Sequence, residues 1–280
     1  MFWKSTYNEF IKIAAKPRSY IGIGAITLIV GIILFAMKAD GLSFISFVTQ
    51  PFEQSLSFEG NILNGNLIAF IILQMLIIHV PLLIALVTGD LVSGEGAMGT
   101  IRLLLTKPIS RTKILFSKYL AGCAYTLIIL LWLGFLALIV GKMLFGSGDL
   151  MVLNSDGLVV LQEKDLFWRF VCGFSLAYLS LVMIATLSLT LSCFSENSIG
   201  PIVSTMAIII LFTIIGALDL PAMQQIQPYL FTTHMVSWRN FFEDPLPVDK
   251  IIHSSMILLL HIVALLGIAV YKFNRKDILS

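Results

Sequence analysis

Residues 89–120, GDLVSGEGAMGTIRLLLTKPISRTKILFSKYL, form the charged, glycine-rich run whose residue types and spacing could serve chemistry. Within it, residues 94–100 (GEGAMGT) have glycines spaced as in a loop that binds nucleotide phosphates. Such a loop needs a lysine directly after its second glycine and a strand before it, and this segment has neither. No other stretch matches a nucleotide-binding motif. The sequence therefore predicts no cofactor on this chain, and if the protein consumes ATP, another chain binds it.

The same run is basic, and residues 89–113 have the composition of an elbow between two helices. Two acidic residues, Asp90 and Glu95, stand against five cations: Arg102, Lys107, Arg111, Lys113 and Lys118. We expect residues 100–106 to form a short helix that Pro108 stops, with Ser110 capping the next helix. We expect the preceding helix to be broken by the glycines of the elbow, namely Gly89, Gly94, Gly96 and Gly99.

The elements that would hold this elbow are membrane helices. The 280 residues are 58% hydrophobic and only 12% charged, whereas soluble domains carry about 25% charged residues. Six apolar runs approach the roughly 20 residues that a spanning helix needs. They are continuous rather than alternating, which favours helices over a β-barrel. The predicted spans are residues 20–37, 67–88, 114–140, 168–193, 201–218 and 251–271.

The basic residues predict the orientation of these spans. Twelve of the 18 Lys and Arg residues fall in residues 1–19, in the elbow with the foot of the following span, or in the tail after residue 271. The positive-inside rule places these three segments in the cytoplasm, as an even number of spans requires. A short helix with apolar and basic faces, held there below two spans, suits a groove on a soluble partner. The alternative is a surface helix that contacts only lipid headgroups.

Two flanking segments are rich in aromatic residues. In residues 1–19, Trp3 and Tyr7 recur on one side of a helix, with Glu9 and Lys12 on the other, which is typical of a helix lying on the membrane. Residues 219–250 are half apolar and contain four prolines. We expect short helices that rest on the outer leaflet with their aromatic side chains at the interface, the residues concerned being Tyr229, Phe231, Trp238, Phe241 and Phe242.

Some span residues invite specific expectations. Pro81 is expected to kink the second span. Gln74 and His79 in that span are candidates for function, but hydrogen bonding to a neighbouring helix is the favoured interpretation. The glycines of the first span suggest close packing against a neighbour or a second copy. No metal site is predicted, because the methionines near the outer face are equally suited to filling gaps.

Three segments carry a resemblance to a known family: residues 90–95 (DLVSGE), 99–105 (GTIRLLL) and 108–111 (PISR), followed by Lys118. In these the chain resembles the membrane subunits of ABC-2-type ABC transporters. Such subunits carry a comparable acidic, Gly-Thr, Leu-rich, Pro-x-Ser-Arg run between their second and third spans. The chain looks closest to the single-polypeptide bacterial permeases, a branch that includes copper/nitrous-oxide-maturation and sodium or drug export members.

The resemblance implies one all-α transmembrane domain over residues 1–280, in a permease of the cell inner membrane with both termini cytoplasmic. Two such subunits, identical or different, would pair above two ATPase subunits that hold ATP and Mg. Membrane lipid is the remaining partner, and no nucleic acid is implied. Residues 94–106 would be the coupling helix, with the transport path between the two bundles near the first, second and fifth spans. The implied ATPase-coupling residues are Gly94, Glu95, Gly99, Thr100, Arg102, Leu103, Pro108 and Arg111.

An enzyme is the alternative class. The tetrapeptide Gly173-Phe-Ser175-Leu is similar to the Gly-x-Ser-x motif of rhomboid intramembrane serine proteases, which also have six helices. His261 on the last span could act as the base, provided that it lies within hydrogen-bond reach of Ser175. A four-residue motif in a Ser-rich helix is a weak signal, and the elbow would then have no role.

Overall fold

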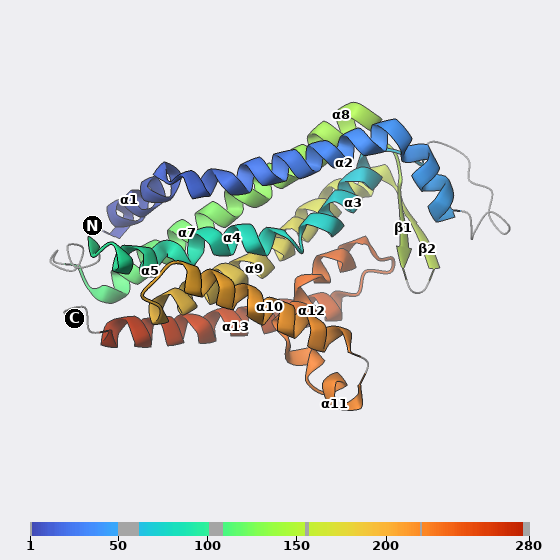
Figure 1. Cartoon of the computed structure of the whole chain (residues 1–280). Coiled ribbons are helices and arrows are strands. Elements are labelled where there is room, and N and C mark those ends of the chain that lie inside the picture. Colours follow the sequence, from blue (N-terminus) through green and yellow to red (C-terminus); the bar gives the residue numbers. More distant parts are fainter. Residues whose placement is uncertain (1, 50–61, 101–108, 155–156, 219, 277–280) are drawn as a thin grey trace.

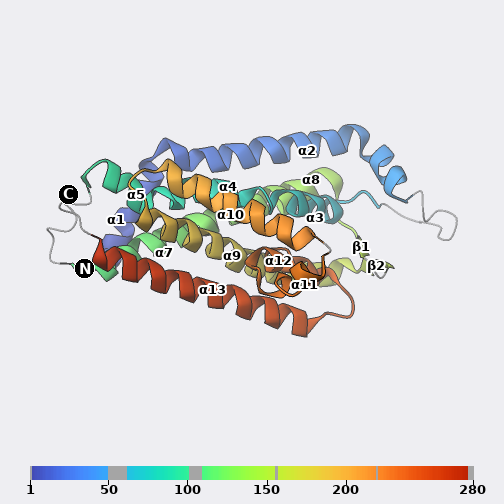
Figure 2. The same cartoon turned by 60° about the horizontal axis from the view of Figure 1, so that its bottom comes forward.

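The computed structural model describes residues 2–49, 62–100, 109–154, 157–218 and 220–276. Six of the described helices are long and apolar enough to cross a membrane: Pro17–Ser43, Val80–Ala97, Arg111–Phe145, Glu163–Phe194, Ile199–Ala217 and Val248–Arg275. They run side by side along one long axis, and both termini lie at the same end of the bundle (Figures 1 and 2). The chain is therefore an all-α, multi-pass membrane protein, as its apolar runs predicted.

The first half of the chain contains α1 Phe2–Ala15, α2 Pro17–Thr49, α3 Gly65–Leu76, α4 Val80–Thr88, α5 Asp90–Ala97, α7 Arg111–Gly134, the π-helix η1 Phe135–Val140 and α8 Gly141–Phe145. A hairpin of β1 Leu150–Asn154 and β2 Gly157–Leu161 follows. The second half contains α9 Glu163–Phe194, α10 Ile199–Ala217, α11 Pro221–Gln224, η2 Gln227–Tyr229, α12 Phe231–Met235, η3 Ser237–Phe242 and α13 Val248–Arg275. Most helices run past the predicted spans because backbone hydrogen bonding continues into their polar ends.

The second predicted span, residues 67–88, is two helices rather than one kinked helix. Helix α3 ends at Leu76, α4 begins at Val80, and Pro81 lies in the first turn of α4. Proline is tolerated there because the first turn has no intrahelical partner for its nitrogen. The interruption at residues 77–79 is the turn directly before Pro81, whose missing N–H removes the helical bond to the Ile77 carbonyl, so the predicted effect of Pro81 is found there as a break between two helices.

The elbow glycines also behave differently from the prediction. Gly89 has helical angles (φ −66°, ψ −21°), and both Gly94 and Gly96 lie inside α5. The helical path therefore continues from Val80 to Ala97. It ends at Gly99, whose φ of +68° is a left-handed conformation that glycine adopts without steric cost. Only the last of the four predicted breaks is correct.

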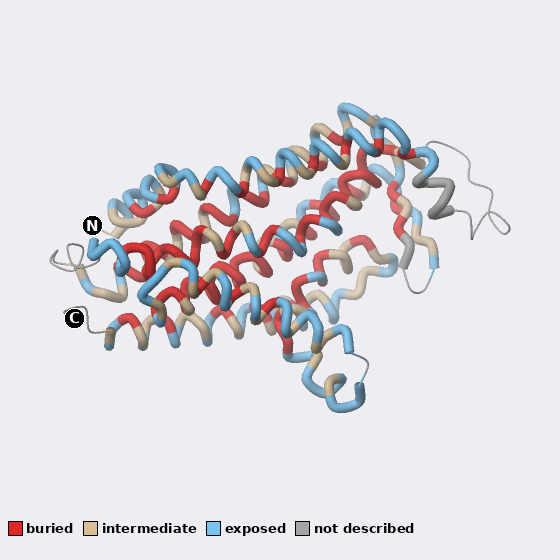
Figure 3. The backbone as a smooth tube through the Cα atoms, viewed as in Figure 1, coloured by how far each residue is buried: buried red, intermediate tan, exposed pale blue. Residues whose placement is uncertain are grey.

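Helix α9 is the centre of the bundle, and it packs against α4, α5, α7, α10, α13 and η3. The share of buried residues is 67% in its most apolar window but only 17% in those of α10 and α13. Figure 3 shows the buried positions gathered along the middle of the molecule, while the outer side of α2 is exposed. Helices α2, α10 and α13 thus present wide apolar faces outward.

Two features at the end of the bundle away from the termini were not predicted. The loop before α9 forms the antiparallel hairpin β1–β2, with Leu150 paired to Leu161. The segment before α13 does form short helices, but Phe231, Trp238 and Phe242 are buried inside the protein. The ring centroids of Trp238 and Phe242 lie 5.6 and 5.1 Å from that of Phe70 in α3. Placing these three aromatic residues at the membrane interface was therefore wrong.

Candidate functional site

Four charged side chains from three helices form a closed ring of ion pairs near the chain termini. Lys12 Nζ in α1 lies 2.6 Å from Glu9 Oε1 and 2.8 Å from Glu95 Oε1 of α5. Lys118 Nζ in α7 lies 2.7 Å from Glu9 Oε2 and 2.8 Å from Glu95 Oε2. Each glutamate thus contacts both lysines, and we call these four residues the ion ring.

The ion ring is buried because α1 packs along α7. The side chain of Lys118 is 1% exposed, and those of Glu9 and Glu95 are 4% and 8% exposed. Glu9 was predicted on the water-facing side of α1, and that placement is wrong. A buried ammonium group requires carboxylate partners, and Glu9 supplies one of them. The outward side of α1 instead carries Trp3 and Tyr7, which are 76% and 66% exposed.

Lys12 is the most exposed member of the ion ring, at 45% of its side chain. Partial burial lowers the pKa of Lys12, but hydrogen bonds and charge attraction from Glu9 and Glu95 outweigh that effect, so the net pKa is raised. The lysine is therefore charged over the whole physiological pH range. It closes the ring at its solvent side.

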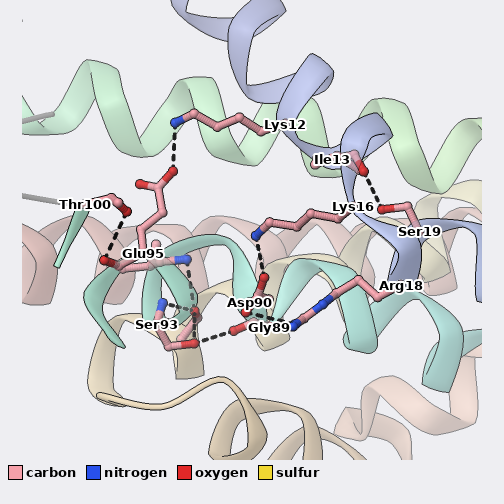
Figure 4. Close-up of polar contacts among 12 residues, drawn as sticks. Lys12, Ile13, Lys16, Arg18, Ser19, Gly89, Asp90, Ser93, Glu95 and Thr100 are labelled. Carbon is pink, nitrogen blue, oxygen red and sulfur yellow. Dashed lines mark hydrogen bonds and ion pairs between the residues drawn. The ribbon is translucent and has the colours of Figure 1, made fainter. Parts of the chain in front are cut away.

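A second cluster joins the start of α2 to the start of α5. Asp90 Oδ2 lies 2.6 Å from Lys16 Nζ, and its Oδ1 lies 2.9 Å from Arg18 Nη1 (Figure 4). Gly94 lies one turn after Asp90, and a Cβ at Gly94 would collide with the Asp90 carboxylate. The two clusters line one small pocket between α1, α4, α5 and α7.

Helix α5 is also fixed to the central helix α9. The backbone N–H groups of Val92 and Ser93 donate to Ser192 Oγ at 3.2 and 2.9 Å. Ser192 Oγ in turn lies 3.1 Å from Ser93 Oγ. A displacement of α5 would therefore act directly on α1, α7 and α9.

The predicted coupling residues fall into three groups. Gly94 and Glu95 are buried within the clusters, while Gly99 and Thr100 are exposed beyond the end of α5. Arg111 donates to the backbone oxygens of Asn274 and Lys276 at 3.0 and 2.9 Å, which ties the start of α7 to the end of α13. Arg102, Leu103 and Pro108 lie outside the described residues. Glu95 and Arg111 thus belong to separate contacts within the chain.

Most members of the two clusters are not predicted by the sequence pattern. The pattern marks Lys118 only as a cation at the foot of a span, and Glu9 only as part of a polar helix face. One signal could have found them, since a lysine inside an apolar run must meet a carboxylate when the run is buried. Which carboxylate it meets depends on the packing of α1 on α7, which the sequence pattern does not contain.

Ser175 and His261, the two residues of the alternative protease, each hydrogen-bond to a backbone carbonyl of their own helix. Ser175 is exposed and donates to the Val171 carbonyl at 2.8 Å. His261 Nδ1 lies 2.8 Å from the Ile257 carbonyl, and its ring packs at 6.0 Å against that of Phe231. Among the hydrogen bonds of the described residues, none joins Ser175 to His261. No three His, Cys, Asp or Glu side chains of the described residues converge as metal ligands.

A third polar cluster holds α12 against α13. His234 Nε2 donates to the Pro228 carbonyl at 2.8 Å, and Nδ1 accepts from Ser254 Oγ at 3.0 Å. Ser237 Oγ lies 2.9 Å from the same Ser254 oxygen. Burial lowers the pKa of His234, and the nearby His253 and His261 lower it further against a raising contribution from the Pro228 hydrogen bond. The neutral imidazole fits this arrangement.

We expect acid to weaken the contact between α12 and α13. Because the pKa of His234 is lower when folded, the unfolded chain binds more protons below about pH 6.5. The stabilising contribution is complete above that pH and is lost as the pH falls toward the folded pKa. His234→Leu should cost about 1–3 kcal/mol at pH 7.5 through its lost hydrogen bonds, and this difference from the wild type should shrink at pH 5. Thermal unfolding at both pH values tests this, and a difference that is constant with pH contradicts it.

Over residues 23–279 the sequence matches the model of a family described as "Protein of unknown function (DUF2705)". It is also 30% identical over 118 residues to the "Uncharacterized protein YhcI" of Bacillus subtilis (strain 168). That alignment covers 40% of this chain and 37% of the relative, so the match spans little more than a third of the relative's length. Neither description names an activity.

Proposed function

The chain belongs to the DUF2705 family, and we propose that it is the membrane-spanning permease subunit of an ABC-2-type transporter. In this proposal the protein lies in the cell inner membrane with both termini in the cytoplasm. A separate ATPase subunit holds ATP and Mg, and a second permease subunit completes the transporter. Nucleotide hydrolysis on the partner chain moves this chain, which exports a substrate.

The arrangement of α5 supports the proposal most strongly. Residues 96–100 are exposed at the end of the bundle that also holds both termini (Figure 1). Directly behind them, Glu95 and Asp90 are buried in ion pairs with α1, α7 and the start of α2. Residues 96–100 are thus accessible to a partner, while the preceding turns of α5 are bound to several helices. A displacement of α5 by the partner would therefore be transmitted to α1, α2 and α7.

The composition of the spans also supports an external energy source. Carriers driven by an ion gradient commonly use ionisable residues inside their spans. No Asp or Glu occurs in residues 67–88, 114–140, 168–193 or 201–218. The two carboxylates of the span Val80–Ala97, Asp90 and Glu95, lie in its last turns and are held in ion pairs. A chain with no other carboxylate in these runs and no nucleotide motif fits the role of a subunit moved by another protein.

The tip of α5 gives a direct test. Met98 is 62% exposed within the elbow, directly after α5, and Met143 is 80% exposed in α8 at the far end of the bundle. We expect Met98→Asp to weaken ATPase binding by at least tenfold, because a charge at the centre of an apolar docking contact costs about 2 kcal/mol or more. Binding of a candidate ATPase subunit and ATP turnover would be measured in nanodiscs.

Met143→Asp is the matched control, since it makes the same change at the opposite end. It should leave ATPase binding and turnover as in the wild type. If both variants bind the ATPase and stimulate its turnover like the wild type, α5 is not the docking element and the proposal fails.

A further inference from the structure

The break between α3 and α4 lies midway along the bundle, between α2 on one side and α10 on the other (Figures 1 and 2). The His79 N–H donates to the Leu76 carbonyl at 2.8 Å, and the Leu82 N–H donates to the His79 carbonyl at 3.1 Å. Pro81 has no N–H, so the carbonyl of Ile77 lacks the helical donor four residues later. The backbone thus passes through a single tightened turn with helical angles, midway along the bundle.

Two polar side chains flank this break, and both are exposed. Gln74 and His79 were expected to hydrogen-bond a neighbouring helix, and that expectation is wrong. His79 Nδ1 lies 2.7 Å from the Met75 carbonyl of its own segment. None of the hydrogen bonds among the described residues reaches the amide of Gln74. Their exposed neighbours are apolar: Met75, Ile78 and Leu82, at 55%, 58% and 46% exposure.

Lipid is a poor environment for this surface. An amide without a partner loses its hydrogen bonds to water when it enters hydrocarbon. Polar side chains at membrane depth almost always face the interior of a bundle or a water-filled cavity. Neither condition is met if α3 and α4 face lipid tails at the break. We therefore expect water to reach Gln74 and His79, which are exposed on this face of the chain.

The hydrogen-bond donors and acceptors of Gln74 and His79 limit the chemical class of ligand that could bind here. Since a carbonyl only accepts, Nδ1 of His79 donates to the Met75 carbonyl, which leaves Nε2 free to meet a ligand. Gln74 offers both a donor and an acceptor. Helices α3, α4 and α10 contain no Asp, Glu, Lys or Arg. A hydroxyl or amide group can be hydrogen-bonded here, but a charged group would have no counter-ion on these helices.

We infer that Gln74 and His79 form a binding site, in the wall of the transport path, for an uncharged amphipathic molecule that carries hydroxyl or amide groups. The polar group of the ligand bonds Gln74 and His79, and its apolar part contacts Met75, Ile78 and Leu82. The assignment rests on the proposed function in one respect, which is that the molecule bound here is the one transported.

Water access is the first test, and it requires no ATPase. In a background with all three cysteines replaced by alanine, Gln74→Cys and His79→Cys would be exposed in nanodiscs to a charged, membrane-impermeant methanethiosulfonate. Leu260→Cys is the control, because Leu260 is 64% exposed midway along α13. Both test positions should react at least tenfold faster than the control. Rates equal to the control, or a disulfide crosslink between two copies of the Gln74→Cys variant without labelling, would overturn the site.

The second test addresses the chemical class of the ligand. It measures the labelling rate of Ile78→Cys in a protein that keeps Gln74 and His79. Mono-oleoylglycerol, which is uncharged and carries hydroxyls, should slow its labelling at least threefold, whereas oleate and oleylamine should not. The protection should disappear in Gln74→Leu and His79→Leu. Equal protection by the charged amphiphiles would overturn the class of ligand. If mono-oleoylglycerol slows the labelling of Ile78→Cys but the protein binds no ATPase, the binding site stands and only the proposed transporter function is rejected.

Discussion

Replacement of Lys118 by methionine should lower the free energy of unfolding by about 3–5 kcal/mol, the usual cost of breaking a buried ion pair. Methionine has a similar volume, so the change removes mainly the charge. Glu9 and Glu95 would then share Lys12 alone, although both remain buried. We expect a lower unfolding midpoint in thermal and detergent titrations, together with loss of the ion pairs that join α7 to α1 and α5.

Lys113→Met is the matched control, because Lys113 is exposed on the same helix. Its effect should stay within about 0.5 kcal/mol. The triple variant Glu9→Gln, Glu95→Gln, Lys118→Met should recover most of the lost stability, since amides carry no charge to bury. Equal unfolding midpoints for the Lys118 and Lys113 variants would refute the structural importance of the ion ring.

Gly65→Ala should be the second most damaging change, with an expected loss of about 3 kcal/mol for overpacking against rigid atoms. A Cβ at Gly65 would lie 2.5 Å from Lys142 Cα and 2.7 Å from Lys142 N. Both are backbone atoms, so no side-chain rotation can relieve the contact and α3 must move away from α8. That movement would also strain the bond from Gly65 N–H to the Gly146 carbonyl, now 2.9 Å.

Gly141→Ala provides the comparison from the other side of the same contact. Its Cβ would meet only the Gly65 carbonyl oxygen, at an ordinary 3.5 Å. Helix propensity favours alanine over glycine by about 1 kcal/mol, so this variant should be neutral or more stable. Thermal unfolding of the two proteins in the same detergent separates the cases, and equal losses would contradict the close approach of α3 and α8.

The membrane spans could be predicted because each depends on a local property. Hydrocarbon excludes charge, and a helix satisfies its own backbone, so an apolar run of sufficient length is enough. Helix ends were less predictable. Gly94 and Gly96 are tolerated within α5 because ion pairs and the contacts with Ser192 stabilise that helix from outside. Propensity alone does not include such tertiary contributions.

The buried polar residues were beyond the reach of pattern analysis. The face of α1 that carries Glu9 has the composition of a solvent-exposed surface. Its burial becomes evident only from the packing of α7, which brings Lys118 into contact with Glu9. Trp238 and Phe242 likewise have the composition of an interfacial belt, yet Phe70 and Phe170 provide an internal apolar contact for them. Glu95 could be singled out as a charged elbow residue, whereas its partners could not.

The uninterrupted helical path of 18 residues from Val80 to Ala97 has a mechanical consequence. At 1.5 Å per residue it is a lever of about 27 Å. One end, at Ala97, lies in the elbow, and the other end, at Val80, follows the turn at residues 77–79. A sideways push of about 3 Å on the tip would rotate the lever by about 6° if it stays rigid. Gln74 and His79 lie close to the turn about which this rotation would occur. The rotation would therefore change the angle between α3 and α4 while moving these two residues little.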